Sequence, residues 1–182
     1  AQVVTNQVPR SILDGKLYPI DVAIGFNSNF NMTSPGAGQW EEALKKIPFY
    51  VHVAPFISEM AEFADVVLPS TTFLEEWGYD HSSPGAGFAE TRIKQPVVKP
   101  MGDSKSIGDI LFRLAERVPG PVTKAFTDVG GSAEGFVRFR TSSLLPWEEF
   151  LKKGVWKGPA YQYGKYSRIF HTPSRKFEFV SG

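Results

Sequence analysis

The sequence predicts an α/β fold, built on a partial doubly wound (Rossmann-like), mostly parallel sheet with helices. Three short apolar runs have the length and composition of buried strands, namely residues 20–25 (IDVAIG), 49–53 (FYVHV) and 65–68 (DVVL). Helical patterns with short connections separate these runs. Alternation of strand and helix is typical of βαβ units with a parallel sheet.

The clearest helical pattern of the first half lies between the first two predicted strands. Trp40, Ala43, Leu44 and Ile47 recur there at the spacing of one helix face. Pro48 follows directly, and the residue before a proline is disfavoured in helical conformation. We therefore expect a helix that ends just before the second strand.

Three more helices are predicted further along the chain. A short one is expected over residues 58–64, with a serine as its N-cap. A longer one is expected over residues 104–118, where apolar residues line one face and Pro119 follows. Another is expected over residues 146–153, because glutamates occupy its first turn, lysines its last turn, and Gly154 suits its C-cap.

The second half of the sequence is less regular. Turn-forming residues occur throughout residues 73–99. Near the end, two phenylalanines alternate with charged residues, which predicts a terminal β-hairpin of residues 168–170 and 176–180. We therefore divide the chain into a Rossmann-like part, residues 1–118, and an irregular extension, residues 119–182, that contains a short helix and the hairpin.

Composition excludes several classes of function. The chain has 182 residues and a net charge of +1, which argues against an electrostatic nucleic-acid binder. It contains no cysteine, so this sequence holds neither a disulfide nor a cysteine-ligated iron–sulfur cluster. No apolar run approaches the ~20 residues that cross a bilayer, so direct membrane insertion is not expected. No secretory signal pattern starts at Ala1.

The most recognisable segment is residues 51–78, which reads VHVAPFISEMAEFADVVLPSTTFLEEWG. It contains Ala-Asp-x-x-Leu-Pro at residues 64–69, followed by Glu75 and Gly78. This segment resembles one shared by large subunits of molybdopterin oxidoreductases of the dimethyl sulfoxide reductase family. Other stretches resemble that family in the same order, namely residues 13–16, 20–27, 96–100, the helix from residue 104, and 172–178 (TPSRKFE).

The resemblance implies that the chain is a fragment of such a large subunit. It would begin inside a nucleotide-binding-like domain and stop where the last domain begins. In this family a molybdenum or tungsten ion, held by two molybdopterin guanine dinucleotides, performs the redox chemistry, and the protein binds and orients the cofactor. We expect no catalytic residue and no metal ligand in this chain. By itself it is expected to bind no cofactor metal and to be no enzyme.

The resemblance places the guanine dinucleotide beyond the C-terminal ends of the strands. Gly25, Asn27 and Asn29 follow the first predicted strand. Glycine permits close approach of a ligand to the backbone, and asparagine tolerates tight turns and offers both a donor and an acceptor. An ordinary strand-to-helix turn is the alternative interpretation.

The segment after the second predicted strand departs from the family. Phe56 and Ser58 are candidate cofactor contacts there. Many relatives have an acidic residue at the position of Ala54 and threonine at the positions of Ser58 and Met60. A missing acid would remove a charge-assisted hydrogen bond to guanine worth ~1.5–3 kcal/mol. Asp65 is a further candidate contact, with a carboxylate-anchored turn as the alternative that we favour.

The remaining ionisable residues suggest structural roles. The three histidines are far apart in sequence and lack metal-ligand spacing. His52 alternates within an apolar strand, so we expect a hydrogen-bonded core or edge residue. His81 lies in a polar segment that could border a substrate funnel. Glu75 is interpreted as an ion-pair partner of Arg92.

Two functions therefore remain open, beside an unrelated α/β binding domain. In the first, the parent is a molybdopterin-dependent oxidoreductase acting in electron transfer, with a weak resemblance near residues 88–98 to relatives that act on sulfur or arsenic compounds. Its partners would be its own remaining domains, a membrane anchor and an iron–sulfur subunit. Its location would be periplasmic or membrane-associated on the outer face, with a cytoplasmic location as the alternative. In the second, the parent is a cofactor-free structural homologue within a membrane-bound, quinone-linked electron-transfer complex, and the alanine at position 54 favours it.

Overall fold

The computed structural model describes residues 5–15, 18–82, 87–118, 120–162, 164 and 170–179. The fold is mixed α/β, as predicted. The chain forms two compact units. The first unit comprises residues 1–77 and 95–136, and the second comprises residues 78–94 and 137–182. The boundary proposed after residue 118 stays a prediction.

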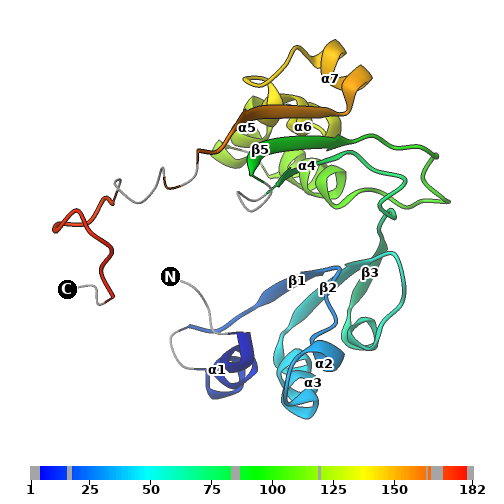
Figure 1. Ribbon diagram of the computed structural model, residues 1–182. Coiled ribbons are helices and arrows are strands. Elements are labelled where there is room, and N and C mark those ends of the chain that lie inside the picture. Colours follow the sequence, from blue (N-terminus) through cyan, green and yellow to red (C-terminus); the bar gives the residue numbers. More distant parts are fainter. Residues whose placement is uncertain are drawn as a thin grey trace. The chain divides into compact units, whose positions relative to one another are not determined.

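The first unit contains the predicted parallel sheet (Figure 1). Its strands are β1 (Val22–Phe26), β2 (Phe49–Ala54) and β3 (Val66–Pro69), hydrogen-bonded in the order β1-β2-β3. Both pairings are parallel. The three predicted strands are confirmed with boundaries shifted by at most two residues.

Helices cover one face of this sheet, and Figure 1 shows them together on one side of β1–β3. A 3-10 turn, η1 (Thr5–Gln7), leads into the first helix. The helical elements of the layer are α1 (Val8–Asp14), α2 (Phe30–Thr33), α3 (Ala37–Lys46) and the 3-10 helix η2 (Glu59–Phe63). The helix predicted around Trp40 is therefore α3, and the short one after Ser58 is η2. Buried Leu44, Ile47, Tyr50 and Met60 form the core between layer and sheet.

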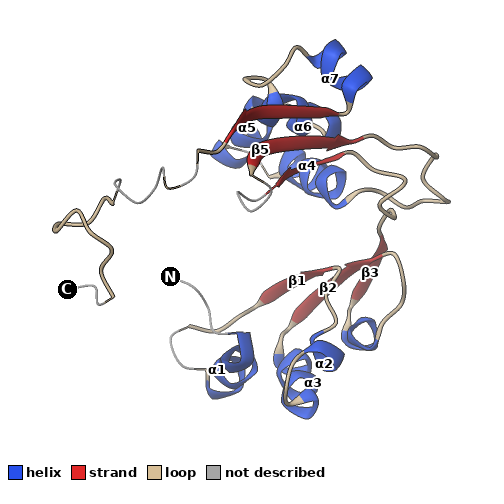
Figure 2. Ribbon diagram, in the orientation of Figure 1, coloured by secondary structure: helices blue, strands red, loops and turns tan. Residues whose placement is uncertain are grey.

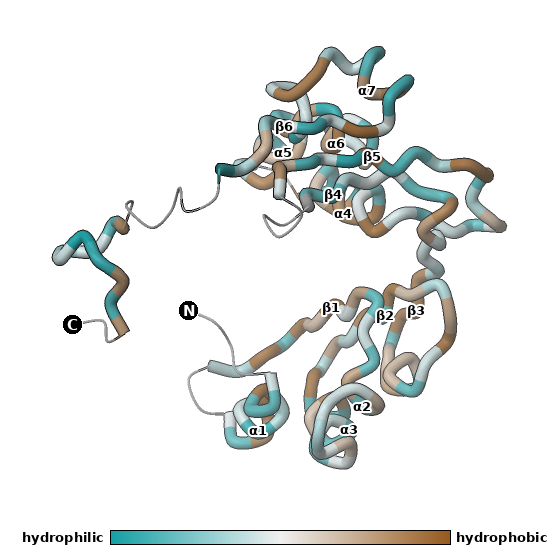
Figure 3. The backbone as a smooth tube through the Cα atoms, viewed as in Figure 1, coloured by the Kyte–Doolittle hydropathy of each residue, from teal (hydrophilic) through white to brown (hydrophobic). Residues whose placement is uncertain are grey.

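The other face of the sheet is apolar but exposed. Alternate residues along the strands share a face, and the register places Val22 beside Phe49 and Ile24 in line with Val66. These four side chains are 57%, 42%, 41% and 37% exposed, respectively. Figure 3 shows the hydrophobic colour along β1. Parallel sheets are normally covered on both faces, and this face is partly exposed, although Val53 on the same face is 0% exposed.

The first unit also contains the predicted long helix, α4 (Ile107–Arg117). Its N-cap is Ser106, whose Oγ accepts from the Asp109 N–H at 3.0 Å and donates to Asp109 Oδ2 at 2.7 Å. The other carboxylate oxygen of Asp109 accepts from the Ala133 N–H at 3.1 Å. The Asp109 carboxylate therefore holds the Ser106 cap of α4 and ties this helix to the start of α6 (Ala133–Thr141).

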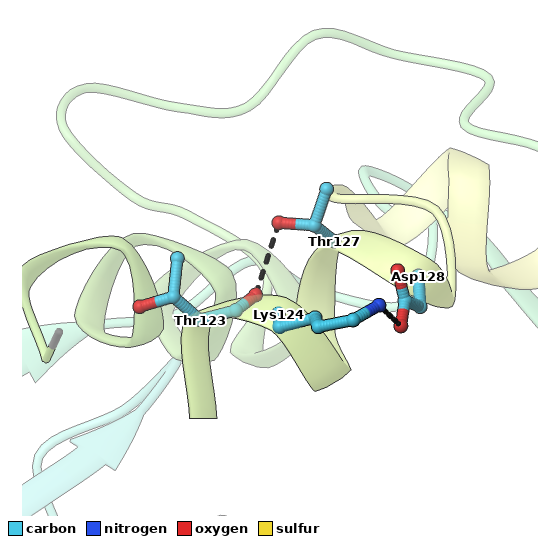
Figure 4. A network of polar contacts seen from close by, with 4 residues as sticks. All are labelled: Thr123, Lys124, Thr127 and Asp128. Atoms are coloured by element: carbon cyan, nitrogen blue, oxygen red, sulfur yellow. Dashed lines mark hydrogen bonds and ion pairs between the residues drawn. The ribbon is translucent and has the colours of Figure 1, made fainter. Parts of the chain in front are cut away.

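Helix α5 (Pro121–Asp128) lies between α4 and α6 in sequence. Figure 4 shows two contacts along it, in which Thr127 Oγ1 donates to the Thr123 carbonyl at 2.9 Å and Lys124 Nζ approaches Asp128 Oδ2 at 2.6 Å. Both charged side chains of that pair are more than half exposed. An exposed i,i+4 pair contributes only about 0.3–0.5 kcal/mol, so this pair adds little to the stability of α5.

The second unit is built on an antiparallel sheet, in the order β4-β5-β6 (Figure 2). Its strands are β4 (Gly78–Ser82), β5 (Phe88–Lys94) and β6 (Val155–Ala160). Helix α7 (Trp147–Lys153) precedes β6 and confirms the helix predicted over residues 146–153. Gly154 ends α7 in the left-handed conformation, as its position predicted.

The antiparallel sheet does not lie where the predicted terminal hairpin was expected. The described residues 170–179 form turns and bends and contain no strand. Residues 168, 169 and 180 of the predicted hairpin lie outside the described residues. Within this segment Thr172 Oγ1 donates to the Lys176 carbonyl, and Glu178 accepts from the Ser174 N–H and hydroxyl. These local side-chain bonds stabilise a turn instead of a strand pair.

Candidate functional site

The C-terminal ends of the three parallel strands bring polar groups together. Asn27, directly after β1, has a positive φ of 45°, which asparagine tolerates better than most residues. Its N–H donates to the Val53 carbonyl of β2 at 2.9 Å, and its Oδ1 accepts from Ser70 Oγ at 3.4 Å. The Ser70 N–H in turn donates to the Ala54 carbonyl at 3.1 Å. One asparagine thus joins the ends of all three strands.

Asn29 and Glu59 form a second polar contact, between the loop after β1 and η2. Asn29 Nδ2 donates to Glu59 Oε2 at 2.5 Å. The backbone N–H of Glu59 and then the Asn29 amide lower the pKa of the Glu59 carboxyl, so this exposed group is ionised at neutral pH. Nearby in sequence, Phe56 and Ile57 are 77% and 86% exposed. An uncharged, exposed aromatic side chain and a carboxylate therefore occupy the segment after β2.

Tyr50, His52 and Ser58 form a series of hydrogen bonds near the C-terminal edge of the parallel sheet. Tyr50 Oη lies 2.8 Å from His52 Nδ1, and Ser58 Oγ lies 3.2 Å from His52 Nε2. Burial lowers the pKa of His52 and raises the pKa of Tyr50 to about 12. His52 is 1% exposed, which confirms the predicted hydrogen-bonded core histidine.

Gly25 has a packing role that the sequence did not reveal. A Cβ atom at this position would lie 2.6 Å from Tyr50 Oη. The Tyr50 side chain is fully buried. The absence of a side chain in β1 therefore makes room for the Tyr50 hydroxyl. A contact between Gly25 and the cofactor stays a prediction.

Replacing Gly25 by alanine is expected to lower the free energy of unfolding by about 1–3 kcal/mol, the usual cost of overpacking a core. Gly38→Ala is the matched control, because nothing lies within 4 Å of a Cβ there in helix α3. Alanine should stabilise that helix by about 0.5–1 kcal/mol. Chemical denaturation of both variants checks this, and an unchanged Gly25→Ala stability would contradict the packing argument.

Asp65 lies at the opposite end of the sheet from Asn27 and Ser58. Its Oδ2 accepts from the Tyr50 N–H at 2.7 Å, and its own N–H donates to the Tyr50 carbonyl at 2.9 Å. The carboxylate therefore anchors the start of β3 against β2. The structure does not bring Asp65 together with the other candidate contacts, and its role in cofactor binding stays a prediction.

Asp65→Ala should cost about 1 kcal/mol of unfolding free energy, the typical net contribution of one hydrogen bond. Asp65→Asn is the control, because an amide oxygen can still accept from the Tyr50 N–H. Urea denaturation should therefore show a smaller loss of unfolding free energy for Asp65→Asn than for Asp65→Ala. Equal losses would show that the charge, rather than the hydrogen bond, matters at this position.

Glu75 and Arg92 each have other partners than the predicted ion pair. Glu75 accepts from the Thr72 N–H and hydroxyl and from the Met101 N–H, and the first two of these bonds lower its pKa most. In the second unit, Arg92 pairs with buried Glu90. Glu75 therefore closes a loop inside the first unit. The predicted ion pair stays a prediction, because Glu75 and Arg92 lie in different units. Sequence did not locate the backbone donors of Thr72 and Met101 that bond to the Glu75 carboxylate.

A hollow of about 620 Å³ lies in the first unit, between the loop after β3 and helix α4. Its lining includes Trp77, Lys105, Asp109, Arg113 and Glu116. Because charges of both signs alternate around it, the hollow favours no simple anion or cation. Among the described residues, no group of three His, Asp or Glu side chains has metal-binding geometry. No helix in the described ranges is long and apolar enough to cross a membrane.

Sequence reasoning identified Asn27, Asn29, Phe56 and Ser58 at the strand-end edge, but it missed Ser70 and Glu59. Ser70 follows directly after the proline of the Ala-Asp-x-x-Leu-Pro pattern. Since parallel strands end at one edge, the first polar residue after each strand was the available signal. Glu59 gave no such signal, because a glutamate in the first turn of a helix is common.

Comparison with known proteins identifies the family of this chain. The sequence model described as molybdopterin oxidoreductase matches residues 7–117. The chain is 30% identical over 213 residues to ArrA, the molybdopterin-containing part of arsenate respiratory reductase from Chrysiogenes arsenatis, covering 98% of this chain and 25% of that protein. It is 30% identical over 139 residues to a tetrathionate reductase component from Salmonella typhimurium, covering 70% of this chain and 14% of that protein.

The fold also matches a solved structure. Acetylene hydratase from Pelobacter acetylenicus superposes with a TM-score of 0.76 at 23% identity, over 93% of this chain and 23% of that one. The chain spans about a quarter of the length of the arsenate reductase protein. The matched family region includes the parallel sheet, its helical layer and α4. This chain belongs to the molybdopterin oxidoreductase family, as a fragment of a large subunit.

Proposed function

We propose that this chain helps to bind the guanine dinucleotide portion of a bis-pterin molybdenum or tungsten cofactor in a longer oxidoreductase. The convergence of Asn27, Ser58 and Ser70 at the C-terminal edge of the parallel sheet is the observation that carries this proposal. Doubly wound sheets bind nucleotides in the crevice outside this edge.

The side chains at this edge suit part of the cofactor. Hydroxyl and amide groups can donate to phosphate and ribose oxygens, and the exposed ring of Phe56 can stack on a base. When bound, the pterin-held metal supplies the redox chemistry, and the residues of this chain bind and orient the nucleotide end. In this proposal Gly25, Asn27, Asn29, Phe56 and Ser58 line the site, and Asp65 supports it from the far end of β2.

The activity proposed for the parent follows from its relatives. The similarity to proteins of an arsenate respiratory reductase and of a tetrathionate reductase supports a parent that acts in electron transfer on arsenic or sulfur compounds. For such a parent we propose a membrane anchor and an iron–sulfur subunit as its partners. We also propose a periplasmic or membrane-associated location on the outer face.

The second candidate is a cofactor-free structural homologue in a quinone-linked complex. Its support is the methyl group of Ala54 at the end of β2, where an acid would be needed to pair with the guanine edge. Glu59 is an ionised carboxylate in the neighbouring element. The two candidates therefore differ in whether this edge binds a guanine nucleotide.

Calorimetric titration of this chain with GDP tests the proposal. We expect saturable binding with a dissociation constant of millimolar or tighter, and Ser58→Ala should weaken it about tenfold, because a hydrogen bond to a charged group is lost. Ser142→Ala is the control, since Ser142 is exposed and its hydroxyl donates to the nearby Phe139 carbonyl. Absence of saturable binding would contradict the proposal and favour the cofactor-free homologue.

A further inference from the structure

The buried chain formed by Tyr50, His52 and Ser58 has a defined direction. Tyr50 Oη lies 2.8 Å from His52 Nδ1, and Ser58 Oγ lies 3.2 Å from His52 Nε2. Tyr50 and His52 are 2% and 1% exposed, whereas Ser58 is half-buried at the edge of the sheet. Ser58 is therefore the more solvent-accessible end of this series of hydrogen bonds.

A neutral imidazole carries one proton, so only two arrangements satisfy both contacts. In the first, Tyr50 O–H donates to Nδ1, and Nε2–H donates to Ser58 Oγ. In the second, Nδ1–H donates to Tyr50 Oη, and Ser58 O–H donates to Nε2. The pKa directions agree with a neutral ring and a protonated phenol, because burial lowers the pKa of His52 and raises that of Tyr50 to about 12.

The two arrangements differ at the buried end. In the second, the Tyr50 hydroxyl hydrogen needs another acceptor, yet His52 is its hydrogen-bond partner among the described residues. The other side of Tyr50 Oη faces Gly25, where even a Cβ would lie 2.6 Å away. The Ser28 hydroxyl lies 3.4 Å from the same Cβ position but forms no hydrogen bond with the phenol. A buried donor without an acceptor is strongly disfavoured. The first arrangement leaves no buried hydrogen unpaired, because the free hydrogen belongs to half-buried Ser58.

We infer that Tyr50 and His52 are positioning residues that fix the Ser58 hydroxyl as an outward-pointing hydrogen-bond donor. Since Ser58 Oγ accepts from His52 Nε2–H, its own hydrogen is free to point toward the C-terminal edge. Ser58 would then select an acceptor group of the ligand, and a phosphoryl oxygen of a nucleotide fits this requirement. The identity of the ligand rests on the proposed function, whereas the direction of the hydrogen bonds from Tyr50 through His52 to Ser58 does not.

The tautomer of His52 tests the inference directly. Long-range ¹H–¹⁵N correlation spectra of this chain, labelled at histidine nitrogens, distinguish Nε2–H from Nδ1–H. We expect Nε2–H for His52 in the wild-type chain, without any substitution that could disturb folding. An Nδ1–H signal would overturn the inference. Tyr50→Phe removes the donor to Nδ1 and should raise the Nδ1–H population, which a merely space-filling tyrosine would not do.

Binding measurements test the consequence for the ligand. With GDP as the probe, Ser58→Ala should weaken binding about tenfold, Ser58→Thr should restore it, and Tyr50→Phe should weaken it with Ser58 still present. Unchanged GDP affinity in Ser58→Ala, beside normal binding by the wild-type chain, would overturn the donor role. If the Nε2–H tautomer is found but GDP does not bind, the proposed function and the assignment of a phosphoryl ligand are wrong. The direction of the hydrogen bonds from Tyr50 to Ser58 is then still supported.

Discussion

Replacing Phe150 with alanine is expected to lower the free energy of unfolding of the second unit by about 3–5 kcal/mol. Phe150 lies in helix α7 and is 0% exposed. Truncation to alanine removes the buried ring and leaves a cavity, and both effects act in the same direction. Domains of this size are marginally stable, so the loss should also increase hydrogen exchange across β4, β5 and β6.

Phe179→Ala provides the matched control in the same unit. Its side chain is 92% exposed, so its removal should change stability by no more than about 0.5 kcal/mol. Chemical denaturation with hydrogen exchange as a local probe measures both variants. A loss below about 1 kcal/mol in Phe150→Ala would show that α7 does not supply the core of this unit.

Gly135→Ala is expected to destabilise the first unit by about 3 kcal/mol, the upper end of the range for overpacking. A Cβ at Gly135 would overlap the Gly130 carbonyl oxygen, which is backbone and cannot rotate away. Gly130 has a φ of +116°, a conformation that side chains rarely adopt. The connection from α5 to α6 therefore depends on two glycines that approach each other closely.

Gly131→Ala separates this close approach from backbone strain. Gly131 lies in the same connection with a φ of +65°, but nothing lies within 4 Å of its Cβ position. The expected cost is therefore the left-handed conformation alone, about 1–2 kcal/mol. Thermal unfolding should give a clearly lower Tm for Gly135→Ala than for Gly131→Ala. The reverse order would contradict the packing between these two glycines.

Sequence predicted the elements whose apolar residues are periodic. Strands β1–β3 are nearly continuous apolar runs, and α3 and α4 have one apolar face, so the buried side of each was visible. The antiparallel strands were missed because they contain charged residues, such as Asp80 in β4 and Glu90 and Arg92 in β5. Glu90 is nevertheless 4% exposed and is compensated by Arg92 and Lys157, a pairing that only the tertiary fold creates.

The candidate site was predictable in part for the same reason. Strand ends can be located from sequence, and Asn27 and Ser58 follow directly from them. The direction of the Tyr50–His52–Ser58 chain was not predictable, because it depends on distances across two elements and on burial at Gly25. Asp65 was a candidate because it lies in the Ala-Asp-x-x-Leu-Pro segment, with a carboxylate-anchored turn as the favoured alternative. It begins a strand, and in a parallel sheet strand starts and strand ends lie at opposite edges.

The most direct test of the account maps where GDP binds on this chain. Backbone ¹H–¹⁵N spectra recorded during a GDP titration should change for residues 27–29, 54, 56–59 and 70, which lie at or beside the C-terminal edge of the parallel sheet. Saturable changes confined to these residues are the predicted result. Changes centred instead on the hollow beside α4, around Lys105 and Arg113, or no saturable change at all, would contradict it.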